Sequence, residues 1–516
     1  MHDAENRDEE LRTGAQRPAE RRLNSAIVRL ASLKTVDRFQ EHLCSLGVKI
    51  PCDHELICGD ASPLRQPLIR GPLKLRNRIA VQPMEGWDGT ADGNPSELTQ
   101  RRWKRFAQAG AGLIWGGEAV AVSHEGRANP NQLVIAPHTL NGLEQLRKTL
   151  MDEQRNLYGS ESVPFIGLQL THSGRYCRPT AHQKSEPRIV YHHPVLDGRL
   201  GLPHDYRVLS DGEIEAIVED FQRAGAMAAQ IGFDFVDIKH CHGYLAHEFL
   251  SAYTRSGEYG GSFENRTRFL REVVRGIRSG TPGLEIGVRL SAFDTVPFHP
   301  DPSQSTPGRP GMGIAEEHES LLPYQWGFGV RRNNPVEPDL DDAIEFLSLL
   351  LGLGIRLVNI TGGSPYYNPH IQRPALYPPS DGYQPPEDPT LGVARQIDVT
   401  RRLKAQFPEM IFVGSAYTYL QEFLPTVAQA VVREGWVDLV GLGRMVLTYP
   451  EILWSASEGQ LVDRRRICRT FSDCTTAPRN GLPSGCYPLD SWYRDSAFAE
   501  KLQVAKRLTP GKPTRG

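Results

Sequence analysis

The chain lacks any hydrophobic run long enough to cross a membrane. Hydrophobic residues make up 39% of its 516 residues, but no uninterrupted apolar stretch approaches the ~18 residues that a membrane helix needs. Residues 1–22 alternate acids with arginines and lack the apolar core of a secretory signal. These absences argue against membrane and secreted classes, and a cytoplasmic location is expected.

An excess of charge of one sign is also absent. The 59 Lys and Arg residues nearly balance the 61 Asp and Glu residues, for a net charge of −2. We therefore expect no general attraction to nucleic acid or to anionic membranes. Eight cysteines in a chain of this length do not make a disulfide framework, which fits a reducing cytoplasm. The expected partner is a small-molecule substrate.

Titratable residues are concentrated just after one apolar stretch. Residues 232–238 (GFDFVDI) form an apolar run with Asp234 pointing outward, which is typical of a strand buried in a parallel sheet. The run leads directly into Lys239, His240, Cys241, His242 and Tyr244. Because catalytic groups of parallel barrels sit at the carboxyl ends of the strands, these residues are the candidate active site.

Strands alternate with helices along most of the chain, which predicts an α/β protein built as a (β/α)8 TIM barrel. Strands are expected within 79–84, 112–120, 164–175, 232–238, 284–291, 356–361, 411–416 and 437–444. Helices are expected at 96–109, 210–230, 264–277 and 341–353, with capping signals at Ser96 and at Ser210 with Glu213.

Three regions are expected in the chain. Residues 1–60 form a tail, disordered to about residue 25, followed by one or two helices within 23–46. Residues 61–460 form the barrel, and residues 461–516 form a C-terminal extension. Within the barrel, residues 293–338 form an insertion that helps to shape the substrate pocket.

Several motifs resemble the old yellow enzyme family of FMN-dependent oxidoreductases. The pattern H-G-Y-L begins at His242, and E-Y-G-G-S-x-E-N-R-x-R-F spans residues 258–269. L-x-N-R-I and P-M fall within 75–84, L-Q-L-x-H-x-G-R at 168–175, and V-R-L-S at 288–291. The alternative is an unrelated barrel with a His-rich loop.

The resemblance implies an FMN site at the ends of the strands. It places Pro83, Met84 and Ala119 against the flavin and Gln169 at its pyrimidine edge, where an amide can both donate and accept. Arg289 would meet the N1 and O2 edge. Alternatively, Gln169 is a satisfied core amide, and Arg289 pairs with a structural acid.

The phosphate of FMN is expected after the last two strands, where such barrels bind phosphate. The resemblance assigns this role to Gly414, Ser415, Gly443 and Arg444, with Ser415 standing where the family has a second Gly. A GxGxxG fingerprint is absent, so a mononucleotide is expected. The family takes hydride from NADH or NADPH, which is expected to come from solution.

Glu85 departs from the family, which usually has Thr or Cys after the Met. A carboxylate near the isoalloxazine would oppose the negative charge that accumulates on reduction. Glu85 should therefore lower the flavin potential, point away, or hold a proton. Alternatively, it pairs with an Arg and never meets the flavin.

The catalytic positions of the family fall on Lys239, His242 and Tyr244. The family has two His, or His and Asn, that bind an activated carbonyl, nitro group or phenolate, and a Tyr that protonates the alkene carbon. Here the first His is Lys239, which could bind a carboxylate or phenolate, or else His240 rotates in. Tyr366 and Arg373 lie in a Pro-rich loop that either lines the substrate pocket or forms an inert lid.

Cys468, Cys474 and Cys486 resemble part of the iron–sulfur motif of larger relatives, but the first spacing is wrong and one Cys is lacking. We expect no metal. Three functions remain: reduction of an activated C=C bond with NAD(P)H, the same cofactor working oxidatively as a dehydrogenase, demethylase or desaturase, and a non-catalytic flavin-binding barrel. The oligomeric state is open, although members of the family often dimerise.

Overall fold

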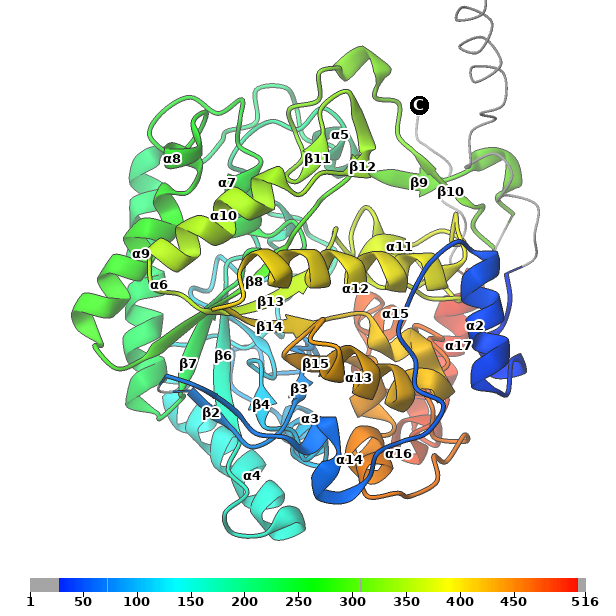
Figure 1. Ribbon diagram of the computed structural model, residues 1–516. Helices are drawn as coiled ribbons and strands as arrows, with labels where there is room; N and C mark the ends of the chain where they lie inside the picture. The colour runs from blue at the N-terminus through cyan, green and yellow to red at the C-terminus, as the bar shows by residue number, and fades with distance from the viewer. Residues whose placement is uncertain (1–26, 72, 307–308, 509–516) are drawn as a thin grey trace, which may run out of the picture.

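Parallel strands at eight positions close into a barrel at the centre of the molecule (Figure 1). The computed structural model describes residues 27–71, 73–306 and 309–508. The strands are β3 (Ile79–Val81), β4 (Leu113–Ile114) with β5 (Ala119–Ala121), β6 (Phe165–Thr171), β7 (Phe235–Ile238), β8 (Glu285–Ser291), β13 (Leu357–Thr361), β14 (Ile411–Gly414) and β15 (Leu439–Leu442). Pairing of β15 with β3 and of β4 with β6 completes the ring, which confirms the predicted TIM barrel.

The second barrel position is broken rather than continuous. Gly116 and Gly117 take positive φ angles of 89° and 50° between β4 and β5, so the strand predicted over 112–120 is interrupted. A Cβ on Gly116 would lie 2.6 Å from the backbone nitrogen of Gln169. Glycine is needed at this position because both the φ angle and the close approach exclude a side chain.

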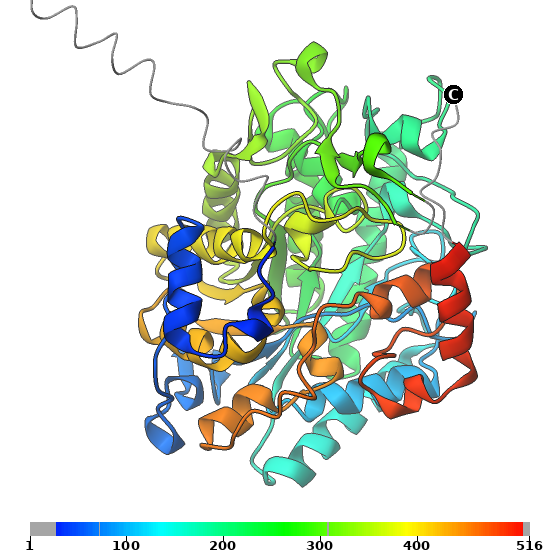
Figure 2. The same cartoon turned by 90° about the vertical axis from the view of Figure 1, so that its right-hand side faces the viewer.

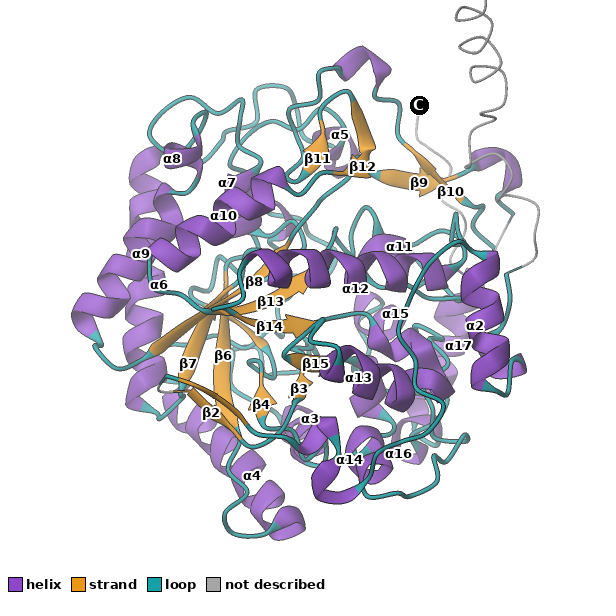
Figure 3. Ribbon diagram, in the orientation of Figure 1, coloured by secondary structure: helices purple, strands orange, loops and turns teal. Residues whose placement is uncertain are grey.

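Helices surround the barrel (Figure 3). They include α3 (Glu97–Ala107), α4 (Leu140–Tyr158), α6 (Asp211–Gln230), α8 (Phe263–Arg266), α9 (Arg268–Gly280), α10 (Asp341–Gly352), α12 (Pro389–Gln406), α13 (Leu424–Arg433) and α14 (Ile452–Ser457). Both predicted caps form: Ser96 and Ser210 each accept from backbone N–H groups of the first turn, in capping boxes. The helix predicted at 264–277 is split at Thr267 into α8 and α9.

The amino-terminal end of the barrel is filled with side chains. Phe235 stacks on Phe165 and meets Trp115 edge-to-face, each with ring centroids 5.3 Å apart. The hairpin of β1 (Leu68–Arg70) and β2 (Leu73–Leu75) closes this end with Leu68, Leu73 and Leu75. Each buried side chain of this kind contributes ~1.5–3 kcal/mol, so this end is a packed floor and only the opposite end is free for a site.

Short elements cover the carboxyl end of the barrel, in the upper part of Figure 1. These are α5 (Leu196–Leu200), α7 (Leu245–Leu250), α11 (Pro369–Gln372), and the hairpins of β9 (Phe298–Pro300) with β10 (Gly313–Ala315) and β11 (Val330–Arg331) with β12 (Asn334–Pro338). Of these, α5 comes from the loop after β6, α7 from the segment after β7, the two hairpins from the insertion after β8, and α11 from the Pro-rich loop after β13.

The two extensions pack against the barrel wall. In the N-terminal one, α2 (Val36–Ser45) stacks Phe39 on Phe423, with ring centroids 4.4 Å apart. The predicted tail, and the first residues of the predicted helical region, lie outside the described residues. At the other end are α15 (Asp473–Arg479), α16 (Ser491–Arg494) and α17 (Ala497–Leu508), coloured red in Figure 2. Arg101 of α3 binds Asp490 at 2.8 Å and anchors this segment to the barrel. Across the described ranges, no helix has both the length and the apolarity to span a membrane.

Candidate active site

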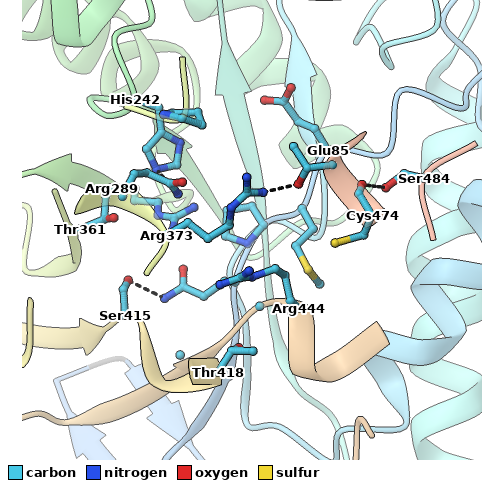
Figure 4. A pocket seen from close by; sticks show the side chains of 18 of the residues that line it. Glu85, His242, Arg289, Thr361, Arg373, Ser415, Thr418, Arg444, Cys474 and Ser484 are labelled. Atoms are coloured by element: carbon cyan, nitrogen blue, oxygen red, sulfur yellow. Dashed lines mark hydrogen bonds between the residues drawn. The ribbon is translucent and has the colours of Figure 1, made fainter. Parts of the chain in front are cut away.

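A cavity of about 230 Å3 opens at the carboxyl ends of the strands (Figure 4). Thirteen of the residues that the sequence proposes for cofactor, substrate or catalysis line it. They are Pro83, Met84, Glu85, Gln169, Lys239, His242, Tyr244, Arg289, Tyr366, Arg373, Ser415, Gly443 and Arg444. The fold therefore brings together residues that are more than 350 positions apart in the chain, between Pro83 and Arg444.

Two of the proposed residues do not line this cavity. Ala119 is buried in β5 opposite Gln169, and its carbonyl accepts from Gln132. Gly414 lies behind the side chain of Gln82, whose Nε2 donates to the Gly414 carbonyl at 3.2 Å and to Ser415 Oγ at 3.1 Å. Gln82 is therefore a neighbour of the proposed phosphate site that no motif in the sequence indicated.

Lys239 and Glu85 form an ion pair on one wall of the cavity. Lys239 Nζ lies 2.7 Å from Glu85 Oε1 and 3.8 Å from the centre of the Tyr244 ring. The other carboxylate oxygen of Glu85 accepts from Trp87 Nε1 at 2.8 Å and from the Tyr244 hydroxyl at 3.2 Å. Glu85 thus faces the cavity and pairs with a lysine, whereas the sequence analysis considered an arginine. Burial, with the nearby charge of Glu85, raises the pKa of Tyr244 well above its ordinary value, so this hydroxyl keeps its proton.

The loop after β7 turns sharply, and this turn decides which of its residues reach the cavity. His242 and Gly243 have φ angles of 68° and 74°, so the strand alternation ends and Lys239 and His242 share the cavity. His240 points away: its Nδ1 lies 2.7 Å from the Ile238 carbonyl, and its ring packs on Phe346 of α10. The alternative in which His240 replaces the family's first His is therefore not supported.

The imidazole of His242 is held neutral. Burial, and then the charges of Arg289 and Lys239, lower its pKa well below the ordinary value. Its Nε2 lies 3.2 Å from Nε2 of Gln372, and its backbone N–H donates to Ser291 Oγ at 3.1 Å. A neutral, fixed imidazole can hydrogen-bond a substrate oxygen without adding charge to the site.

Asp237 is a site residue that the sequence analysis missed. It is fully buried on β7, where it accepts from Gln169 Nε2 at 2.5 Å, from Trp115 Nε1 at 2.7 Å and from the Arg289 N–H at 2.8 Å. The sequence did carry a signal for it, because Asp237 is the second acid, after Asp234, in the apolar run 232–238. By binding one N–H of Gln169, Asp237 fixes the orientation of this amide and leaves its oxygen for another partner.

Three guanidinium groups at the cavity have buried nitrogen atoms without a partner. They are Nε of Arg289, Nη2 of Arg373 and Nη1 of Arg444. Within the described ranges, no carboxylate forms an ion pair with any of the three. Burial lowers the pKa of Arg289 and Arg444, which means that their positive charge is poorly solvated. Such groups call for an anionic ligand.

Open space lies above the end of β15. A Cβ added to Gly443 would have no neighbour closer than Met84 Sδ at 3.9 Å. Together with the unpartnered nitrogen atoms of Arg289 and Arg444, this cradle fits FMN, which carries a phosphate at one end and an electron-accepting ring at the other.

Aromatic side chains form a second wall. Tyr366 stacks on Tyr176 with ring centroids 3.9 Å apart, and its hydroxyl lies 2.8 Å from that of Tyr244. Trp87 also lines the cavity. The Pro-rich loop after β13 thus contributes Tyr366 and Arg373 to the lining, which favours the pocket interpretation over an inert lid.

The C-terminal extension also contributes to the cavity, which the sequence analysis did not anticipate. Cys474, Thr475, Pro478, Arg479 and Ser484 line it. Arg479 donates to Asp381 and, at 2.9 Å, to the Pro365 carbonyl. All eight cysteines are free, and across the described ranges no group of His, Cys, Asp or Glu is placed to hold a metal ion.

None of the described residues of the insertion after β8 lines this cavity. Asp294, Thr295, Pro297 and Trp326 instead line a smaller cavity next to the segment that follows β7. Asp294 is buried there, accepts from the Tyr367 hydroxyl at 2.5 Å, and has its pKa raised to about 7 by burial. The described residues of 293–338 thus do not line this cavity, so the expectation that they help to shape the substrate pocket gains no support from it.

Comparisons with known proteins agree with the motifs. Residues 63–305 match the NADH:flavin oxidoreductase / NADH oxidase family. An NADPH dehydrogenase of Clostridium acetobutylicum is 34% identical over 224 residues, which are 43% of this chain and 61% of that protein. The chain therefore spans about six tenths of the length of this relative.

Solved structures share the fold. Histamine dehydrogenase from Rhizobium sp. 4-9 aligns with a TM-score of 0.60 at 21% identity, over 84% of this chain and 53% of that one. An old yellow enzyme homologue from Zymomonas mobilis aligns with a TM-score of 0.51 at 20% identity, over 78% of this chain and 94% of that one.

Proposed function

Because residues 63–305 match the NADH:flavin oxidoreductase / NADH oxidase family, we propose that the chain is an FMN-dependent oxidoreductase of the old yellow enzyme type. It takes hydride from NADH or NADPH and reduces a C=C bond that is conjugated to a carbonyl or similar group. The observation that carries the proposal is a single cavity in which the unpaired Arg289 lies with the protonated Tyr244. Bound FMN would supply the hydride transfer between the nucleotide and the alkene.

The polar residues of the cavity have distinct roles in this proposal. Arg289 offers a positive charge that forms no ion pair with any described carboxylate, and Gln169, fixed by Asp237, offers an amide oxygen to the cofactor ring. Neutral His242 binds the oxygen of the activating group. Tyr244 donates a proton to the alkene carbon, and its own hydroxyl is positioned by Tyr366 and Glu85.

The ion pair bears on the direction of the reaction. An isolated Glu85 carboxylate would oppose reduction of a flavin and favour the oxidative alternative. Lys239 balances this charge at 2.7 Å, so the electrostatic reason for an oxidative role is weakened. We therefore place reduction first and the dehydrogenase, demethylase or desaturase role second. The retained Tyr244 and Arg289 count against a non-catalytic barrel.

Anaerobic stopped-flow spectroscopy tests the proposal. The protein, loaded with FMN, is mixed with NADH and then with NADPH while the flavin absorbance is followed, and 2-cyclohexen-1-one is added afterwards. Bleaching by one nucleotide followed by reoxidation with the enone supports the reductase. If neither nucleotide bleaches a full flavin spectrum, the oxidative role is favoured, and failure to bind FMN would overturn the assignment.

Four further points stay predictions. They are a cytoplasmic location, the absence of nucleic-acid partners, an oligomeric state, and the division into three regions at 1–60, 61–460 and 461–516.

A further inference from the structure

The cations of the cavity fall into two classes. Lys239 pairs with Glu85, and Arg479 pairs with Asp381, so their charges are balanced within the protein. Arg289, Arg373 and Arg444 are not balanced in this way anywhere in the described part of the chain. The last three must therefore be matched by whatever the cavity binds, because an unpaired buried guanidinium is costly.

Arg373 and Arg444 lie side by side. Arg444 Nη2 donates to the carbonyl of Pro374, the residue that follows Arg373, at 3.1 Å. Each has a buried nitrogen without a partner, Nη2 in Arg373 and Nη1 in Arg444, and both are labelled in Figure 4. Burial, and then the charge of Arg444, lower the pKa of Arg373, as expected for two close cations that lack an anion.

We propose that Arg373 binds the phosphate of FMN together with Arg444, and that Thr475 of the C-terminal extension positions it. The inference rests on the proposed function, which makes FMN the ligand. A phosphate monoester carries close to two negative charges at neutral pH, which two guanidinium groups match. Arg289 then remains for the ring. The sequence alone assigned Arg373 to the substrate because of its position in the loop after β13.

The position of Arg373 depends on a contact between distant parts of the chain. Nη1 of Arg373 donates to Thr475 Oγ1 on α15. That helix is tied to α17 by Lys506 Nζ, which lies 2.8 Å from Asp473 Oδ1. The C-terminal extension is therefore part of the cofactor site. A consequence is that, among the described residues that line the cavity, no unmatched cation remains for a substrate, which should therefore be uncharged there.

A comparison of FMN with riboflavin, which lacks the phosphate, tests whether Arg373 binds the phosphate or acts elsewhere in the site. The full-length apoprotein is titrated into each flavin while flavin fluorescence is followed, for the wild type, Arg373→Met, Arg444→Met and Thr475→Val. We expect Arg373→Met to weaken FMN binding about 10- to 100-fold with riboflavin binding unchanged, and Arg444→Met to act likewise. Thr475→Val should give a smaller loss of the same kind. Inorganic phosphate should compete with FMN in the wild type and less in Arg373→Met.

Arg479→Met is the matched control, since Arg479 lines the same cavity but is already paired. It should leave the ratio of FMN to riboflavin affinity unchanged. Equal effects of Arg373→Met on both flavins, or no effect on either, would overturn the inference while leaving the proposed function intact. A wild type that binds neither flavin would overturn both. Unchanged riboflavin binding also shows that the variant is folded.

Discussion

Lys239 Nζ lies 2.7 Å from Glu85 Oε1 and joins the end of β7 to the segment that follows β3. Both residues depart from the old yellow enzyme pattern, and both are largely buried, with 3% and 14% of their side chains exposed. Either departure alone would place an unpaired charge in the cavity proposed to hold the cofactor. Together they form a neutral unit, so the two substitutions are expected to be energetically coupled.

Lys239→Met should leave the Glu85 carboxylate unpaired in the cavity. We expect a loss of ~3 kcal/mol in the free energy of unfolding and a more negative flavin reduction potential, because the uncompensated charge opposes electron uptake. Urea unfolding and a dye-coupled redox titration measure the two quantities. The double variant Lys239→Met with Glu85→Gln should recover most of the lost stability and most of the change in reduction potential. A double variant no better than the single one would contradict the coupling.

Tyr244→Phe should impair proton donation and not flavin reduction. The reoxidation rate with 2-cyclohexen-1-one should fall by about 10²- to 10⁴-fold, while anaerobic bleaching by NAD(P)H should be nearly unchanged. Because the pKa of Tyr244 is raised, the phenol keeps its proton, and the wild-type reoxidation rate should be flat from about pH 6 to about pH 9. Tyr366→Phe, which removes only the neighbouring hydroxyl, should have a smaller effect. Equal losses in both half-reactions of Tyr244→Phe would point to a structural role.

Asp237→Asn should disturb the cofactor site from within the barrel. Both carboxylate oxygens of Asp237 accept from N–H donors, and an amide would turn one acceptor into a donor that faces another donor. We expect a loss of ~1–3 kcal/mol in the free energy of unfolding and weaker FMN binding, since Gln169 is no longer fixed. Denaturant unfolding with flavin fluorescence tests this. Unchanged FMN affinity in a destabilised variant would restrict Asp237 to a structural role.

Asp294 should make stability depend on pH. Its pKa is about 7 in the folded chain against an ordinary value of 3.8, so the folded state binds this proton more tightly. Its contribution to stability is therefore complete below about pH 4 and is lost as the pH rises through about 7. Asp294→Asn should show a smaller decline between these values, and the difference between the two proteins in urea unfolding isolates this one group. Parallel pH profiles would contradict the assignment.

Local sequence determined much of the framework. Alternating apolar strands and amphipathic helices predicted the barrel, and the caps at Ser96 and Ser210 formed as the residues indicated. The motifs around His242, Gln169 and Arg289 were sufficient to predict that these residues share one cavity. Helix caps and strand patterns depend on residues close together in the chain. The shared cavity follows from a barrel in which all strands end at one edge, so both can be predicted from the sequence.

Contacts between distant segments were decided only by the tertiary structure. The pairing of Lys239 with Glu85, the burial of Asp237 between β6 and β8, and the bond from Arg373 to Thr475 join residues that are 50 to 160 positions apart. The sequence offered each side chain several partners. Strand alternation turned His240 away from the cavity, and the positive φ angles at His242 and Gly243 ended that alternation and brought His242 to the cavity with Lys239. Which charge meets which is set by the three-dimensional path of the loops, because electrostatic and hydrogen-bond partners are selected by distance in space and not along the chain.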